Sequence, residues 1–471
     1  MSLLIGLPTP TCNIYHFLDQ EQKGKHPADV AHRSSLIPHS SPNPCCLPSS
    51  TNSTMLSAGK LLAFLVFLFL DLLDAVLCVV FRFVDGVLEG GGGGGPASQC
   101  YCSGESRGDE LSESLYRRKN VFRKLVGKFA RESGEVVGEK LGKMVERRWS
   151  DCGCESCLSW LRNGDDLKLH VVTFQPSNVH DHDEKSVEVE NVIFLHGFIA
   201  SSSFWTETVV PNLSKKVKKN YRLFAVDLLG FGRSPKPRDC LYTLRDHLEM
   251  VKKSVVESYD LDSFHVVSHS MGCVIGLALA AEYADSVKSV TLVAPPYFPS
   301  EENACVTALG KLAEKKLWPP LAFGSAVMSW YEHVGRCVCF FICRYHLAWE
   351  SVLKLLSRKR NLHFMIVDLT RHTHHSGWHT MHNVLCGGVK FMDDYLTTLN
   401  NSAVKLKVIQ GDKDQVVPME CLLNIKKKFP AAEIRILKNA DHSTVILGRE
   451  KQFAQELESF WDSTRVTDTT Y

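Results

Sequence analysis

The chain has almost no excess of either charge, and its cysteines do not form two well-spaced Cys-x-x-Cys pairs. Its 471 residues include 54 Lys and Arg against 52 Asp and Glu, a formal net charge of +2. A dedicated nucleic-acid binder usually has a strong basic excess, and the central region has no basic stripe interleaved with aromatic residues. We therefore expect no nucleic-acid partner. The 44% of hydrophobic residues is typical of a globular protein.

The 17 cysteines are scattered along the chain. They form small local groups at Cys45 and Cys46, at Cys100 and Cys102, at Cys152, Cys154 and Cys157, and at Cys337, Cys339 and Cys343. None of these groups supplies two well-spaced Cys-x-x-Cys pairs, so no structural zinc site is expected. The cysteines could pair as disulfides in a secreted protein or stay reduced in a reducing compartment, and the sequence leaves both open.

A second candidate for metal binding is the histidine-rich segment RHTHHSGWHTMH, Arg371–His382. It lacks interleaved carboxylate ligands, and exposed histidine-rich helices are common. We interpret it as such a helix. The sequence therefore predicts neither a metal nor a cofactor.

The first part of the chain indicates targeting. Residues 1–57 are rich in Pro, Ser, Asn and His and predict disorder. Residues 58–84 are hydrophobic, and Leu61–Phe81 is long enough to span a bilayer, which takes about 20 residues. Asp71 and Asp74 lie one helical turn apart on one face, which disfavours a plain spanning helix. A signal-anchor or secretory segment is preferred over a buried core helix. Translation from Met55 rather than Met1 would place it where a signal belongs.

Residues 85–165 combine a glycine run, Gly90–Gly95, with a region rich in cysteine and basic residues. The run predicts a flexible linker. Between Ser112 and Trp149 apolar residues recur at helical spacing, which predicts a surface helix, with a membrane-associated amphipathic helix as the alternative.

From about residue 166 short apolar segments alternate with helical ones, which predicts an α/β fold with a mostly parallel sheet. The predicted strands lie within 167–176, 189–198, 221–232, 263–272, 286–296, 403–414 and 432–442. The alternation covers 166–298 and 401–471. Between them, 299–400 is helical in character and aromatic-rich, so we interpret it as a helical cap over the carboxyl ends of the strands.

Polar motifs follow five of these strands in a characteristic order. They are His196-Gly197-Phe198, then Asp227 with GFGRS, then SHSMG around Ser270, and finally GDKDQVVP (411–418) and ADHS (440–443). Each motif is weak by itself, because short matches of this kind are common. Together, at successive strand ends, they predict one site.

The chemistry of a serine nucleophile explains the set. A serine hydroxyl needs a base to take its proton, and the base needs a carboxylate that fixes its tautomer. The order Ser270, then an acid, then His442 is the order expected on this architecture. Asp414 is the preferred acid because it lies further into its loop than Asp412, which we assign to the turn. Ser270 could instead only cap the following helix.

The remaining motif residues have supporting roles. The backbone N–H groups of Met271 and Phe198 are predicted to form the oxyanion hole. His196 and Gly197 would organise the loop that carries Phe198, and Gly272 would allow the tight turn after Ser270. Ser268 occupies the usual first glycine position of G-x-S-x-G, where we expect a small packing residue.

Three other motif residues are predicted to have structural roles. His269 should point away from the nucleophile, and Asp227 and Arg233 should hold a loop near the pocket. An aspartate at the elbow would indicate epoxide hydrolase or dehalogenase chemistry, and Ser270 argues against both.

FLHGF, DLLGFGRS, HSMG, GDKDQVVP and ADHS together resemble the α/β-hydrolase superfamily. The acid-containing apolar run, Cys100–Cys102, SLYRRKNVFRKL and SDCGCESCLSWL resemble the N-terminal region of the plant BODYGUARD family. The resemblance implies an α/β-hydrolase fold and a probable lysophospholipase needed for cuticle formation, acting on lipid esters or cutin precursors. It also implies a location at the plasma membrane or in the cell wall.

Three functions stay open at this point. A serine esterase leads, an acyltransferase could use the same residues, and a non-catalytic receptor or scaffold could retain them without turnover. The sequons at Asn52, Asn212 and Asn400 offer a test of topology. The sequence is silent on oligomeric state.

Overall fold

The computed structural model describes residues 51–89, 120, 122, 147–163, 167–176, 189–298, 324, 327–402 and 404–465. Most of the segment 1–57 predicted as disordered, the glycine run and nearly all of the helix predicted between Ser112 and Trp149 lie outside these residues. Residues 51–57 of the first segment are described and are helical. The chain divides into two units, 1–56 and 57–471, and the second contains the α/β core.

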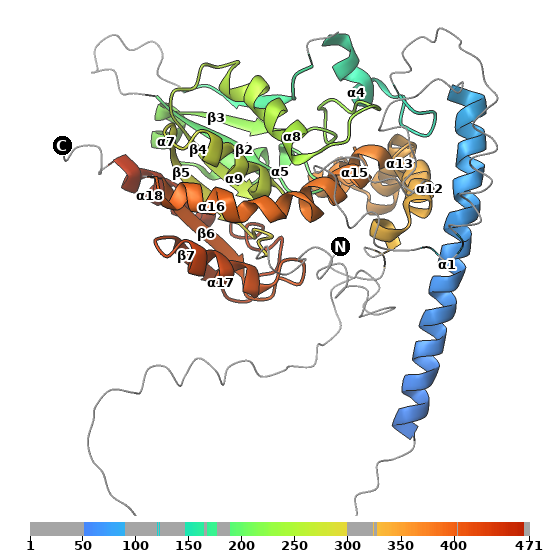
Figure 1. The fold of residues 1–471 in the computed structure, drawn as a ribbon. Coiled ribbons are helices and arrows are strands. Elements are labelled where there is room, and N and C mark those ends of the chain that lie inside the picture. Colours follow the sequence, from blue (N-terminus) through green and yellow to red (C-terminus); the bar gives the residue numbers. More distant parts are fainter. Residues whose placement is uncertain are drawn as a thin grey trace, which may run out of the picture. The chain divides into compact units, whose positions relative to one another are not determined.

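A seven-stranded sheet forms the centre of the core, with strand order β1-β3-β2-β4-β5-β6-β7 (Figure 1). Only β1 runs antiparallel to its neighbour, and the other pairs are parallel. The strands are β1 Val171–Phe174, β2 Glu190–Leu195, β3 Tyr221–Val226, β4 Phe264–His269, β5 Val287–Val293, β6 Lys405–Gly411 and β7 Glu433–Leu437. The predicted mostly parallel sheet is confirmed.

Helices cover both faces of the sheet because the central strands are apolar on both sides. Along β2, Ile193 and Leu195 pack into one core cluster, whereas Val192 and Phe194 pack into the other. The first face is covered by α8 Leu244–Val251, η4 Lys252–Val256, α9 Gly272–Glu282, α16 Met392–Asn400 and α17 Met419–Lys428. The second is covered by α5 Ser203–Thr206, α6 Val209–Asn212, α7 Lys215–Asn220 and α18 Glu450–Arg465.

The described part of the interval predicted as a cap is helical. It contains α12 Glu332–Ile342, α13 His346–Ser357, α14 Phe364–Asp368, α15 His374–Thr380, η5 Met381–Cys386 and η6 Gly388–Phe391. The interpretation of the histidine-rich segment as an exposed helix is wrong. His375, His379 and His382 are buried, because this helix packs inside the cap and against the loop before α8.

Two elements precede the sheet. α1 spans Thr51–Glu89, so it begins before the predicted hydrophobic segment 58–84 and ends after it. The helix is long and apolar enough to cross a membrane. The short elements α4 Glu155–Leu158 and η3 Ser159–Asn163 follow the basic region.

Candidate active site

Ser270 occupies a sharp turn between β4 and α9. Its φ of +52° is in the left-handed region, which non-glycine residues adopt at a cost of roughly 1–3 kcal/mol. The turn is held by a bond from the Ser270 amide to the Val293 carbonyl, 2.8 Å, and by one from the Cys273 amide to the Ser270 carbonyl, 2.9 Å. Ser270 therefore has the strained strand-to-helix geometry of a nucleophile elbow.

Two glycines let the end of β2 lie against this turn. A Cβ on Gly272 would come within 2.6 Å of the His196 carbonyl oxygen, and one on Gly197 would lie 3.2 Å from the Ser270 Cβ. Real Cβ atoms do not approach a backbone oxygen as closely as 2.6 Å. Gly272 is thus required by the close approach of the β2 end to the start of α9.

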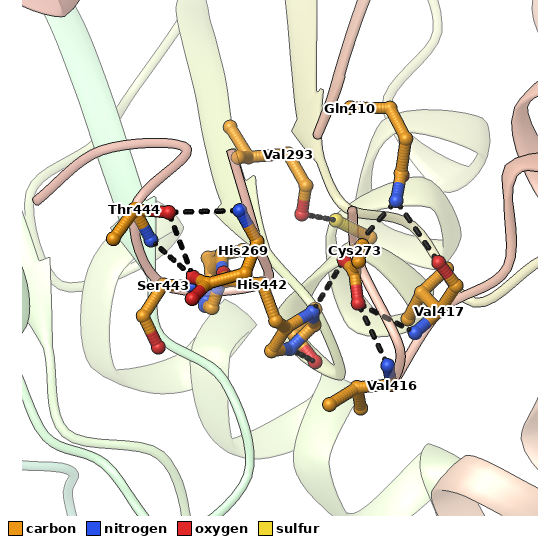
Figure 2. Close-up of polar contacts among 12 residues, drawn as sticks. His269, Cys273, Val293, Gln410, Val416, Val417, His442, Ser443 and Thr444 are labelled. Carbon is orange, nitrogen blue, oxygen red and sulfur yellow. Dashed lines mark hydrogen bonds and ion pairs between the residues drawn. The ribbon is translucent and has the colours of Figure 1, made fainter. Parts of the chain in front are cut away.

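Three side chains from distant loops form a hydrogen-bonded chain at this turn. Figure 2 shows its central residue, His442. The Nε2 atom of His442 lies 3.0 Å from the Ser270 Oγ, and its Nδ1 atom lies 2.8 Å from an Asp414 carboxylate oxygen. Ser270 follows β4, Asp414 follows β6 and His442 follows β7, so the parallel sheet brings the three strand ends to one edge.

The two predicted oxyanion donors lie on either side of Ser270. Met271 directly follows the nucleophile, and Phe198 follows Gly197, which contacts the elbow. Among the residues that the structure describes, neither backbone N–H donates a hydrogen bond within the protein. Both are therefore available to an incoming oxygen atom.

Comparison with known proteins assigns the chain to a family. The model of the alpha/beta hydrolase fold matches residues 190–318. Probable lysophospholipase BODYGUARD 4 of Arabidopsis thaliana is 53% identical over 418 residues, covering 85% of this chain and 96% of that protein. The chain belongs to the BODYGUARD family. BODYGUARD 5 of the same plant is 50% identical, covering 84% and 93%, and BODYGUARD 1 is 37% identical, covering 86% and 96%. The α/β-hydrolase fold expected from the motifs is thereby confirmed.

In this BODYGUARD chain the two acids of the loop after β6, Asp412 and Asp414, have different surroundings. Asp414 has a fully buried side chain and also accepts hydrogen bonds from the Val416 and Val417 amides and from Gln410 Nε2, at 2.8, 2.9 and 3.1 Å. Asp412 is exposed. The structure thus places Asp414, and not Asp412, against His442. Gln410, near the end of β6, had no role predicted from the sequence.

His196 controls the direction of the Phe198 amide. Its Nε2 accepts a hydrogen bond from the Leu228 amide at 2.9 Å, so its proton is on Nδ1, which donates to the Gly197 carbonyl at 2.7 Å. Burial lowers the pKa of His196, which keeps the ring neutral and this pattern intact. Because the peptide unit is planar, fixing the Gly197 carbonyl also orients the N–H of Phe198.

His269 has a positioning contact that its sequence neighbourhood did not reveal. Its Nε2 lies 3.1 Å from the backbone oxygen of His442, and its ring stacks on Phe204 with 4.8 Å between centroids. Burial, with His442 nearby, lowers the pKa of His269 to about 3. His269 therefore stays neutral, donates to the loop that carries His442, and lies off the hydrogen-bonded chain.

Asp227 organises the loops beside the site. Its two oxygens accept from the Ser202 amide at 2.6 Å and from the Arg233 amide at 2.8 Å. A Cβ on Gly232 would collide with this carboxylate at 2.3 Å. Asp227 thus ties the turn after β3 to the loop that follows Phe198.

A cavity of about 630 Å³ lies elsewhere in the core. It is lined by residues such as Trp160, His170, Arg233 and Tyr259, and none of its lining residues belongs to the Ser270–His442–Asp414 chain. This cavity therefore does not mark the candidate active site, which we locate by the hydrogen-bonded side chains.

Proposed function

We propose that this BODYGUARD protein is a serine hydrolase of lipid carboxylic esters, with Ser270 as nucleophile, His442 as general base and Asp414 as its carboxylate partner. The observation that carries the proposal is the hydrogen-bonded chain Asp414–His442–Ser270 at a strained elbow. A serine in this setting can be deprotonated as it attacks, because the imidazolium that forms lies against a buried carboxylate.

In the first half of the reaction, Ser270 Oγ attacks the ester carbonyl carbon while His442 Nε2 accepts its proton. The carbonyl oxygen becomes an oxyanion, and the amides of Met271 and Phe198 would donate to it. Collapse of the tetrahedral intermediate breaks the bond to the alcohol, which takes the proton from His442. An acyl group then remains on Ser270.

In the second half, water loses a proton to His442 and attacks the acyl-enzyme. The acyl–oxygen bond to Ser270 breaks, and His442 returns its proton to the Ser270 oxygen. The products are a free carboxylic acid and the original enzyme. The Asp414 carboxylate stabilises the imidazolium that forms on His442 in each half.

The proposed substrate class rests on the family and on the N-terminal helix. The related Arabidopsis proteins are named as probable lysophospholipases. α1 is able to cross a membrane, and many of its apolar side chains are exposed, Phe64 and Phe83 among them, at 62% and 72%. An enzyme held at a lipid surface meets lysophospholipids and cutin precursors directly. We propose such esters as substrates and cuticle formation as the process served.

The proposed location is the plasma membrane or the cell wall, with the α/β core on the extracellular side. The disulfide at Cys386 supports passage through an oxidising compartment. Asn212 and Asn400 are both exposed in the core, as glycosylation requires. In plant cells, we expect a glycosidase to increase the mobility of the protein and Asn212→Gln with Asn400→Gln to abolish that shift. A protein without any shift would contradict an extracellular core.

The test of the activity compares the full chain with Ser270→Ala against a panel of lysophospholipids and other lipid esters. We expect a loss of kcat/KM of ~10⁴-fold or more, because members of such a triad act as a unit. A fluorophosphonate probe should label the unaltered protein and not the variant. Absence of labelling in a folded protein would favour the non-catalytic scaffold.

The same assay distinguishes hydrolysis from acyl transfer. With an acyl-glycerol donor and a hydroxy fatty acid as acceptor, a transferase would form a new ester, whereas a hydrolase releases only free acid. Transfer requires that the pocket exclude water from the acyl-enzyme, and the aromatic-rich cap is the feature in the chain that favours it.

A further inference from the structure

Four potential metal ligands meet at a place that the proposed reaction does not use. Cys152 and Cys154 directly precede α4, and Cys157 lies within it. His346 is the first residue of α13 in the cap. Their sulfur and nitrogen ligand atoms all lie within 4.8 Å of one another. The nearest of these cysteines is 189 residues from His346, so only the fold brings them together.

The distances fit a tetrahedral ion. His346 Nε2 lies 3.3 Å from the Cys154 sulfur and 3.4 Å from the Cys157 sulfur. Zinc binds thiolate sulfur at about 2.3 Å and imidazole nitrogen at about 2.0 Å, so two such ligands at the tetrahedral angle lie about 3.5 Å apart. A disulfide needs two sulfurs about 2.05 Å apart, and these three cysteines are not disulfide-bonded.

The second nitrogen of His346 has the partner that a metal-binding histidine requires. Its Nδ1 lies 3.0 Å from a Glu350 carboxylate oxygen, and the His346 side chain is fully buried. Glu350 is itself 3.7 Å from the Arg371 guanidinium. A carboxylate on Nδ1 holds the proton there and leaves the Nε2 lone pair facing the sulfurs, as in carboxylate–histidine–zinc arrangements.

Neighbouring groups also suit a cluster of thiolates. The Cys154 amide lies 3.4 Å from the Cys152 sulfur, and Ser156 Oγ lies 3.3 Å from the Cys154 sulfur. The buried Lys236 ammonium acts electrostatically on Cys157. One divalent cation with three thiolates has a net charge of −1, which this ammonium would offset.

A second group, Cys339, Cys343 and His372, is a useful contrast. Both sulfurs lie 3.7 Å from His372 Nε2, but the group has only three members among the described residues. Its histidine has a buried Nδ1 with no hydrogen-bond partner in that part of the chain. In the described part of the chain, no fourth ligand atom lies within 4.8 Å of all three members and His372 has no carboxylate partner, so no metal is assigned to this group.

We propose that Cys152, Cys154, Cys157 and His346 bind one Zn²⁺ ion in a closed structural site. Soft thiolates with one imidazole in a tetrahedral set select zinc, and four protein ligands leave no position for a substrate or water. The ion would fasten the segment that precedes the sheet to helix α13 of the cap. It would also keep three thiolates reduced in an oxidising compartment.

The test measures metal in the full chain, purified in detergent without chelators or added zinc. We expect about one zinc ion per chain by elemental analysis. Cys154→Ser, Cys157→Ser and His346→Ala should each lose most of it. Glu350→Gln should keep the ligands but weaken zinc affinity roughly 10- to 100-fold in a chelator competition. The matched control is Cys337→Ser, a cysteine on α12 outside the group, which should retain full zinc.

Cobalt exchange gives a readout on the unaltered protein in case a variant does not fold. Cobalt in the site should show the intense visible bands of tetrahedral thiolate coordination, and zinc should remove them. The proposal is overturned by a protein purified without zinc that shows no such bands, by iron in place of zinc, or by a disulfide joining two of Cys152, Cys154 and Cys157 in non-reducing peptide mapping. None of these measurements depends on hydrolase activity.

Discussion

Ser268 occupies a position where the nucleophile motif usually has glycine, and the structure shows how its side chain is accommodated. Ser268 is fully buried, and its hydroxyl has no hydrogen-bond partner in the described part of the chain. A Cβ on Gly276, one turn into α9, would lie only 2.2 Å from the Ser268 Oγ. The missing glycine is thus compensated by a glycine on the facing helix.

This pairing predicts a rescue. Gly276→Ala should destabilise the protein by about 1–3 kcal/mol through overpacking against Ser268. Ser268→Gly alone should be tolerated, and Ser268→Gly combined with Gly276→Ala should recover most of the lost stability. Thermal unfolding measures the effect, and fluorophosphonate labelling of Ser270 reports on the elbow. Loss of labelling in a folded Ser268→Gly protein would show that Ser268 is more than a packing residue.

The two acids of the GDKD loop allow a matched comparison. Asp414→Asn should lower kcat by ~10³–10⁴-fold, because an amide cannot hold the required tautomer of His442 or stabilise its charged form. Asp412→Asn, two residues away and exposed, should leave kcat nearly unchanged. Both variants should fold with similar melting temperatures, measured alongside the ester assay. Equal losses in the two variants would refute the assignment of Asp414.

At the scale of the elements, the acids of α1 explain why it is not a uniform apolar helix. An Asp74 oxygen accepts from the His333 and Val334 amides, at 2.9 and 3.2 Å, in the first turn of α12. Helix N-termini leave such amides without intrahelical partners. The N-cap residue of α12, Tyr331, makes no side-chain cap, so Asp74 supplies the cap from another helix.

One turn further along α12, Arg336 pairs with Asp85 of α1 through two bonds of 2.7 Å. Its guanidinium also lies over the Phe81 ring, 4.4 Å from the centroid. Such a planar, bidentate contact suits arginine and not lysine. The polar face of α1 therefore contacts the cap, while many of its apolar side chains remain exposed.

Breaking this contact should loosen α1 from the cap. Arg336→Met should lower stability by about 2 kcal/mol or more, since it leaves the Asp85 carboxylate without its main partner. Arg336→Lys should recover only part of the loss. Thermal unfolding in detergent and protease sensitivity of the segment after α1 are the measurements. The exposed Arg360 provides the control, and Arg360→Met should have no effect.

At the scale of the whole molecule, buried histidines determine how stability depends on pH. Burial lowers the pKa of His247, His269 and His382 to about 3, and it lowers the pKa of His170, His196, His375 and His379 as well. Burial acts in the opposite direction on two carboxyls. It raises the pKa of Asp368 to about 7 and that of Asp151 to about 6.

These shifts predict that acid weakens the fold. Below about pH 6.5 the unfolded chain takes up protons on histidines that stay neutral when folded, so each such histidine costs up to about 1.4 kcal/mol per pH unit. The two carboxyls stay protonated in the folded state and oppose the trend, but they are outnumbered. We therefore expect the melting temperature to fall between pH 7 and pH 5.

A single histidine can be tested within this trend. His247→Gln removes one group that only the unfolded chain protonates, so the melting temperature should fall less steeply with acid. The same change at the exposed His363 should leave the slope as it is. A melting temperature that rose on acidification would contradict the burial of these rings.

Much of the fold and of the candidate site could be predicted from the sequence because the signals are local. Each strand is an apolar run bounded by glycine or polar residues, so seven segments could be placed before any contact was known. The order Ser270, Asp414, His442 could be read because each residue directly follows a strand, and parallel strands bring their carboxyl ends to one edge.

What only the tertiary structure decided are the contacts between segments far apart in the chain. Four such contacts leave no periodic pattern in the sequence. They are the burial of the 371–382 histidines, the cap that Asp74 places on α12, the bond from His269 to the His442 loop and the meeting of His346 with three cysteines. The same holds for Gly276, which looks like any helix glycine until Ser268 lies opposite it. These contacts depend on which surfaces pack together when the chain folds, and the shape of the whole core determines that packing.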